Sequence, residues 1–189
     1  MALTAISGQK TWLNVKNGLI IKSEKDPESG EYSNTEHRAI EGLVTDIIIV
    51  EKTDLQGTPY KELQIGISDD ENYMLCSRMF KPFSDGLLLS LGNADLTKPV
   101  RIAPYKGKES NGKNPPVYCS VRYQGEKDSI KWVEDIPAIE KIDQGTGEYV
   151  IVRKERNIAL LQLVEDIKEK YSMPISSNQE LKSNQEVLD

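Results

Sequence analysis

Two stretches of the chain place an arginine and a tyrosine on the same expected face of a β-strand. In residues 98–105 and 117–123, apolar side chains occupy alternate positions, which predicts two strands that each bury one face. The opposite, outward positions hold Arg101, Tyr105, Tyr118 and Arg122. Aromatic rings stack on nucleobases and guanidinium groups neutralise phosphates, so this combination is typical of surfaces that hold single-stranded nucleic acid.

Neighbouring segments add side chains of the same two kinds. Strands predicted at residues 60–68 and 73–80 place two more aromatic rings and one arginine outward, and residues 106–116 predict a Gly/Lys/Asn/Pro loop that could clamp a phosphate chain. The full set of predicted DNA-binding residues is Tyr60, Arg78, Phe80, Arg101, Tyr105, Lys106, Lys108, Lys113, Tyr118, Arg122 and Lys131. The alternative is structural, because tyrosine and arginine also stabilise cross-strand pairs on exposed sheets, and a lysine-rich loop can be a solubilising turn.

The charge of the chain is unevenly distributed. The net charge is −6, yet residues 98–132 hold eight lysines and arginines against three acidic residues, a net charge of +5, which leaves −11 for the rest. A basic face on an acidic body can bind phosphates locally, while the acidic remainder discourages non-specific association.

Few residues are available for metal or acid–base chemistry. His37 is the only histidine, and the two cysteines, Cys76 and Cys119, lie in separate predicted strands without a CxxC spacing. Zinc usually needs four such ligands, so we predict no metal, no cofactor and no catalytic centre. Two free thiols are expected in a reducing compartment, with a disulfide as the alternative. No stretch reaches the roughly 18–20 apolar residues that span a bilayer, and the N-terminus lacks a signal-peptide pattern, which predicts no membrane association and a cytosolic protein.

The order of the predicted elements favours an OB-like barrel. Asn17-Gly18 predicts a hairpin turn within residues 12–22, and the polar residues 23–38 are expected to form a long, mobile loop. Three strands, a short helix at residues 82–91 and two more strands follow, which is the order of a five-stranded Greek-key OB barrel. These strands are expected at residues 43–53, 60–68, 73–80, 98–105 and 117–123.

The chain after the barrel is expected to end in a helix. Residues 135–153 look irregular, with one candidate strand at 149–152, and residues 156–171 predict an amphipathic helix. Its expected apolar stripe is Ile158, Leu161, Val164, Ile167 and Tyr171. This stripe would pack on the domain or, alternatively, form a homodimer.

The predicted fold is therefore mainly β, a five-stranded OB-like barrel with an N-terminal hairpin and a C-terminal helix. The segments are an N-terminal hairpin and mobile loop packed on the barrel (1–39), the OB core (40–134), a C-terminal extension with the amphipathic helix (135–171) and a flexible tail (172–189).

Several runs of residues resemble phage single-stranded DNA-binding proteins. The runs are 40–47 (IEGLVTDI), 60–65 (YKELQI), 87–89 (LLL), 93–100 (NADLTKPV) and 104–106 (PYK). The similarity is a pattern of strands and turns that extends roughly from Trp12 to Trp132. It implies an OB fold that coats exposed single strands during phage DNA replication and recombination, in the cytoplasm of a bacterial host, and contacts replication proteins.

The C-terminal tail departs from the pattern of that family. Many bacterial and phage members end in a strongly acidic tail with a terminal aromatic residue, which docks partner proteins. Here the tail carries Glu180, Glu186 and Asp189 against Lys182, and it ends in Val-Leu-Asp.

We therefore expect a non-enzymatic protein that binds and protects single-stranded DNA largely independently of sequence. The main alternative is a phage protein-interaction module, structural or host-defence-blocking, that uses the same barrel without binding nucleic acid, because a fold does not fix a function. An enzyme is a third alternative, for which the sequence offers no convergent acid, base and nucleophile.

Overall fold

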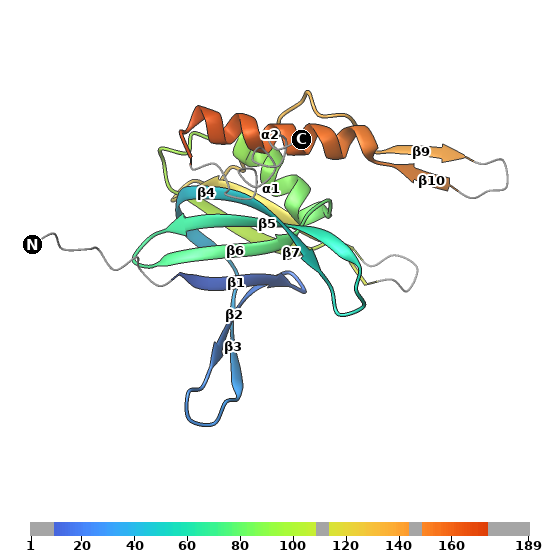
Figure 1. Cartoon of the computed structure of the whole chain (residues 1–189). Helices are drawn as coiled ribbons and strands as arrows, with labels where there is room; N and C mark the ends of the chain where they lie inside the picture. The colour runs from blue at the N-terminus through green and yellow to red at the C-terminus, as the bar shows by residue number, and fades with distance from the viewer. Residues whose placement is uncertain (1–9, 109–113, 144–148, 174–189) are drawn as a thin grey trace, which may run out of the picture.

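The described residues form one large curled sheet, a separate pair of strands and two helices (Figure 1). The computed structural model describes residues 10–108, 114–143 and 149–173. Eight strands hydrogen-bond in the order β3-β2-β1-β6-β5-β4-β7-β8 within this described part. They are β1 (Thr11–Lys16), β2 (Leu19–Lys25), β3 (Tyr32–His37), β4 (Ile40–Thr53), β5 (Pro59–Ser68), β6 (Asn72–Arg78), β7 (Val100–Lys106) and β8 (Val117–Tyr123). The sheet curls into a half-barrel, and both helices lie on one side of it.

The long strand β4 gives the sheet its curl, because it pairs with a different strand at each end. Residues 43–53 pair antiparallel with β5, and residues 40–42 pair antiparallel with β7. The register shifts just after Val44, which marks a β-bulge, a feature that bends a strand. Gly42 has a φ of 148°, and a Cβ there would lie 2.6 Å from the Ser68 carbonyl oxygen, so this crossing of strands requires glycine.

The first hairpin confirms the predicted Asn17-Gly18 turn. Both residues have positive φ, 54° and 77°, as the tight turn between β1 and β2 requires. β1 also pairs in parallel with β6, and the turn lies against β7, where a Cβ on Gly18 would approach the Lys106 backbone nitrogen to 3.1 Å. The β1–β2 hairpin therefore contacts β6 through strand pairing and the end of β7 through its turn.

Residues 23–38 are not the loop that their polar composition predicts. β2 continues to Lys25, and β3 pairs with it antiparallel. Every residue of β3 is exposed, and the β2–β3 hairpin projects from the sheet in Figure 1. A strand without a buried face has no reason to alternate apolar and polar residues, so its sequence carries no period-2 signal.

The helices complete the core on the inner side of the sheet. α1 (Pro82–Asn93), predicted as a short helix, is almost entirely buried between β8 and α2 (Lys154–Lys170). The predicted inward residues of β5, Leu63, Ile65 and Ile67, are at most 1% exposed. These side chains and those of α1 belong to one apolar core.

The apolar face of α2 differs from the predicted stripe. Its buried side chains are Leu160, Leu163, Val164, Ile167 and Lys168. Ile158 is 58% exposed, because successive steps of three residues drift by about 60° around a helix of 3.6 residues per turn and so leave the packed face. The buried face packs within the chain, and the alternative of a homodimer through α2 stays a prediction.

A second hairpin extends from the other end of the molecule. The candidate strand at 149–152 is confirmed as β10 (Tyr149–Val152), and it pairs with β9 (Glu140–Asp143) from the segment expected to be irregular. Figure 1 shows this pair reaching away from the body just before α2 begins.

The coarse prediction of a mainly β fold with a C-terminal helix is confirmed. The sheet has eight strands in the described residues, not five, because β1 joins the edge of β6 and brings β2 and β3 with it. No helix in the described residues is long and apolar enough to cross a membrane.

Candidate nucleic-acid interface

Two adjoining hollows lie at one end of the curled sheet. One, of about 570 Å³, lies between the start of β5 and the turn after β6, and the other, of about 390 Å³, lies between β6, the start of α1 and the start of β8. Both are lined by Arg78 and Lys81, so together they form one continuous depression, which we call the groove. Its lining also includes Tyr60, Phe80, Val15, Pro116 and Val117.

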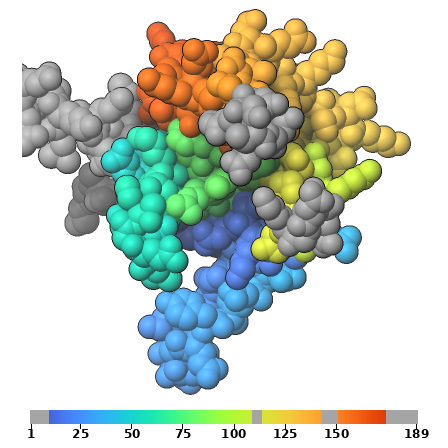
Figure 2. Space-filling model, turned by 90° about the vertical axis from the view of Figure 1, so that its right-hand side faces the viewer, coloured from blue at the N-terminus to red at the C-terminus, as the bar shows by residue number. Residues whose placement is uncertain are grey.

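Figure 2 looks onto this side of the molecule. The β4–β5 hairpin, in cyan, and the first residues of β8, in yellow, flank the green segment where α1 begins. The lining of the groove thus comes from the start of β5, the end of β6 with the turn that follows it, and the first residues of β8.

Tyr60 and Arg78 form a stacked pair in the groove. The guanidinium carbon of Arg78 lies 4.5 Å from the centroid of the Tyr60 ring, within the range of a cation–π contact. Arg78 also lies 3.5 Å from Asp54 Oδ2, and 45% of its side chain is exposed. A planar cation held against a ring offers a stacking surface and a charge at the same place.

Asp54 holds the turn that carries one wall of the groove. Its Oδ1 accepts hydrogen bonds from the backbone N–H groups of Thr58, at 2.9 Å, and Gln56, at 3.0 Å. These two hydrogen bonds hold the pKa of the Asp54 carboxyl below its usual value, and the bond from Thr58 has the larger effect. The carboxylate stays charged and keeps Arg78 oriented towards Tyr60.

Phe80 lines the groove from a turn instead of from a strand. β6 ends at Arg78, and Phe80 follows with a φ of 61°, a left-handed conformation that is unusual for a bulky residue. The expectation that Phe80 points outward from a strand is therefore wrong. Its ring is half-buried and packs on the edge of the core, and the residue lines the same hollow as Tyr60.

Tyr105 and Tyr118 confirm the predicted aromatic pair on the outer face of β7 and β8. They are direct cross-strand neighbours, with ring centroids 5.7 Å apart and an interplanar angle of 27°. Tyr105 is 50% exposed, and the Tyr118 ring fills the space that a side chain at Gly107 would need. Val117, which lines the groove, precedes Tyr118 on β8, and successive residues of a strand point to opposite faces, so the tyrosine pair lies on the face of β8 opposite to that lining.

The lysines of the predicted set have different surroundings. Lys106 and Lys108 are exposed beside the tyrosine pair, whereas Lys131 is exposed after β8, where its carbonyl accepts a hydrogen bond from Asn93. Lys113 lies outside the described residues.

The two arginines of β7 and β8 are separated from the groove. Arg101 and Arg122 face each other across the strands, four residues along from the tyrosine pair. Arg101 donates a hydrogen bond to Glu41, so its charge is balanced within the chain. The structure therefore brings Tyr60, Arg78 and Phe80 together at the groove and places the tyrosine and arginine pairs on the outer face of β7 and β8.

No family model, curated protein or solved structure matches this chain.

Two residues of the site were not predicted from the sequence. Lys81 lines both hollows, and Arg153 donates a hydrogen bond to the Phe80 carbonyl oxygen at 2.7 Å. The Lys81-Pro82 pair signals a helix start and could have drawn attention to Lys81. Arg153 lies 73 residues from Phe80, and no local pattern indicates their contact.

The remaining reactive side chains are inert. Cys76 and Cys119 are buried and free, as expected, and burial raises the pKa of the Cys76 thiol to about 12 and that of Cys119 still further above its usual value. Both thiols therefore stay protonated at neutral pH. Within the described residues, no three histidine, cysteine or acidic side chains are grouped so that they could hold a metal ion.

Proposed function

We propose that the protein binds single-stranded DNA with little preference for sequence. The observation that carries this proposal is the groove itself, whose lining combines the Tyr60 and Phe80 rings with the cations of Arg78 and Lys81. Rings stack on any base, and cations neutralise the phosphates between them, so such a surface holds a strand without reading base edges. The stacked Tyr105–Tyr118 pair offers a second aromatic surface, on the outer face of β7 and β8.

The strand order supports the finer proposal of an OB-type core. The run β6-β5-β4-β7-β8, with α1 between β6 and β7 along the chain, has the order of an OB barrel whose strands 1 to 5 are β4, β5, β6, β7 and β8. OB barrels bind oligonucleotides on strands 2 and 3, between the loops that join strands 1–2 and 4–5. One hollow of the groove lies at the start of β5 and the end of β6, and the other reaches the first residues of β8.

The biological setting follows from the resemblance to phage single-stranded DNA-binding proteins. In that setting the protein coats and protects exposed strands during phage replication or recombination, in the cytoplasm of the bacterial host and alongside phage replication proteins. The groove contains stacking and charged groups but no arrangement that demands a chemical step, so we propose a binding protein without an enzymatic activity of its own.

The salt dependence of binding tests the proposal directly. Arg78, Lys81, Lys106 and Lys108 would neutralise about four phosphates, so log K for fluorescein-labelled oligo-dT should fall with log salt at a slope of about −3. Fluorescence anisotropy at several salt concentrations measures this slope, with a duplex of equal length as the control. Binding that is absent, insensitive to salt or equally strong for the duplex would exclude the proposed function.

Arg101 should contribute little to this binding, in contrast to the sequence-based expectation. Because Arg101 lies outside the groove, Arg101→Ala should change the affinity for oligo-dT by less than about twofold. Arg78 also has an acidic partner, Asp54, but it lines both hollows and lies against the Tyr60 ring, so Arg78→Ala should weaken binding by more than about fivefold in the same anisotropy assay. Equal losses in the two variants would mean that strands also bind on the outer face of β7.

A second candidate function is protein binding. The observation that favours it is a group of exposed isoleucines on and around the β9–β10 hairpin, Ile139, Ile142 and Ile151. Failure of the protein to bind oligo-dT at low salt would favour this candidate over the first.

A further inference from the structure

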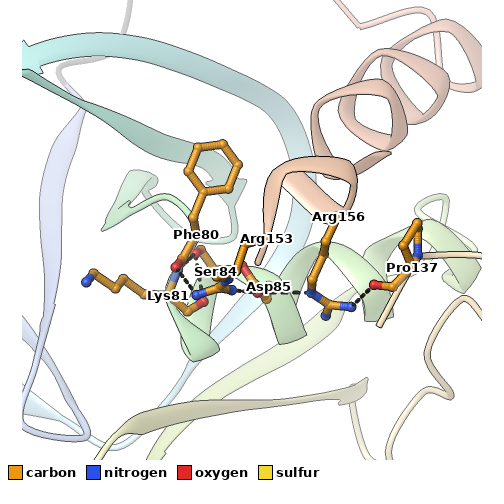
Figure 3. Close-up of polar contacts among 7 residues, drawn as sticks. All are labelled: Phe80, Lys81, Ser84, Asp85, Pro137, Arg153 and Arg156. Atoms are coloured by element: carbon orange, nitrogen blue, oxygen red, sulfur yellow. Dashed lines mark hydrogen bonds and ion pairs between the residues drawn. The ribbon is translucent and has the colours of Figure 1, made fainter. Parts of the chain in front are cut away.

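We propose that Arg153 is a positioning residue of the groove, which acts through Phe80. The inference rests on the proposed function and adds to it that the C-terminal extension helps to form the DNA-binding site. Arg153 is the residue just before α2, and it reaches back to the turn that joins β6 to α1 (Figure 3).

The geometry of Phe80 requires outside support. Its left-handed backbone, with a φ of 61°, is a conformation that persists only where the surroundings fix it. The Phe80 carbonyl oxygen accepts a hydrogen bond from Arg153 Nη1 at 2.7 Å, and Arg153 Nη2 donates to Asp85 Oδ2. A two-point guanidinium contact of this kind fixes both the position and the direction of the carbonyl.

The neighbouring backbone groups are already bound elsewhere. The Met79 N–H donates to the Lys61 carbonyl at 2.9 Å, and Lys81 exchanges hydrogen bonds with the Ser84 hydroxyl, at 3.1 Å from its N–H and 3.0 Å from its carbonyl oxygen. The Phe80–Lys81 peptide is thus held at both ends, by the Ser84 hydroxyl at its N–H and by Arg153 at its carbonyl oxygen. Loss of Arg153 would remove one of these two contacts and loosen the turn that carries the Phe80 ring.

Arg156 offers a matched control for this role. It donates to the same oxygen, Asp85 Oδ2, at 3.4 Å, but its second contact is the Pro137 carbonyl oxygen at 2.8 Å. Figure 3 shows the two arginines on either side of the shared carboxylate. Both therefore join α2 to α1, and only Arg153 touches the groove.

The test compares Arg153→Met with Arg156→Met in the full chain. We expect Arg153→Met to bind labelled oligo-dT about tenfold more weakly than wild type, and Arg156→Met to bind within about twofold of it. In the background of Phe80→Ala, Arg153→Met should cause no further loss, because the residue through which it acts is gone. Urea denaturation of each variant checks that the proteins are folded under the assay conditions.

The possible results separate this inference from the proposed function. Wild-type protein that does not bind oligo-dT would contradict the function itself. Wild-type protein that binds, with equal losses for Arg153→Met and Arg156→Met or an additive loss with Phe80→Ala, would overturn the positioning role alone. If Arg153→Met does not fold, Arg153→Lys replaces it, because lysine keeps the charge beside Asp85 without the two-point fork. We then expect a loss of about threefold, and an unchanged affinity would overturn the inference.

Discussion

Replacing both Tyr60 and Phe80 with alanine should weaken binding to oligo-dT by about 100-fold. Each stacked base contributes roughly 1–3 kcal/mol, and the two rings line the same hollow of the groove. Loss of two such contacts at about 1.4 kcal/mol each, within this range, corresponds to about two orders of magnitude in the dissociation constant. Anisotropy of labelled oligo-dT at low salt, where wild-type binding is strongest, measures the effect over the widest range.

Tyr32 provides the matched control for the aromatic variants. It is 69% exposed on the β2–β3 hairpin and lies near a cation, with Lys25 Nζ 6.0 Å from its ring centroid, but it is not part of the groove. Tyr32→Ala should therefore leave the affinity within about twofold of wild type. A loss as large as that of the double variant would mean that any exposed ring contributes and that the groove is not the site.

Phe80 also packs on the core, so the stacking role needs a variant that preserves packing. Phe80→Leu keeps an apolar side chain of similar size but removes the π-face. If the ring stacks on a base, this variant should lose about as much affinity as Phe80→Ala while its urea midpoint stays closer to wild type. If Phe80→Leu bound oligo-dT as tightly as wild type, Phe80 would shape the groove without stacking on a base.

The sequence predicted those parts of the fold that follow from a local period. Alternation on β7 and β8 is the reason that Tyr105 and Tyr118 could be placed on one face, and their stacked rings confirm it. The hairpin turn was equally predictable, because an Asn-Gly pair such as Asn17-Gly18 between two apolar runs is typical of a tight hairpin turn. The β2–β3 hairpin was not predictable, because a fully exposed strand carries no such period.

The parts of the site that depend on contacts between distant residues could not be predicted. Arg101 looked free on its own strand, and its partner, Glu41, lies 60 residues earlier in the chain. Phe80 was assigned to a strand because nothing local shows that β6 ends at Arg78. The left-handed turn is fixed by Arg153, from the far end of the chain, and is therefore visible only in three dimensions.

Asp85 should be the polar residue on which the stability of the fold depends most. Asp85→Ala should lower the free energy of unfolding by about 3 kcal/mol, because it leaves two arginines with little access to water and without their counter-ion. The Arg153 and Arg156 side chains are 24% and 12% exposed, and Asp85 itself is 7% exposed. Urea denaturation followed by tryptophan fluorescence can measure the change, since Trp132 packs near Gly86 in the next position of α1.

The apolar contacts between α1 and α2 determine how the Asp85→Ala variant should unfold in urea. Leu160, Val164 and Ile167 are each at most 2% exposed, and each contributes about 1.5–3 kcal/mol by burial, so their sum exceeds the loss from the charged cluster. We therefore expect one cooperative transition at lower urea, without prior release of α2. Asp166→Ala, which removes an exposed carboxylate from α2, should shift the free energy by less than about 0.5 kcal/mol. If Asp85→Ala is as mild as this control, or unfolds in two steps, the buried carboxylate is not what joins the C-terminal extension to the groove.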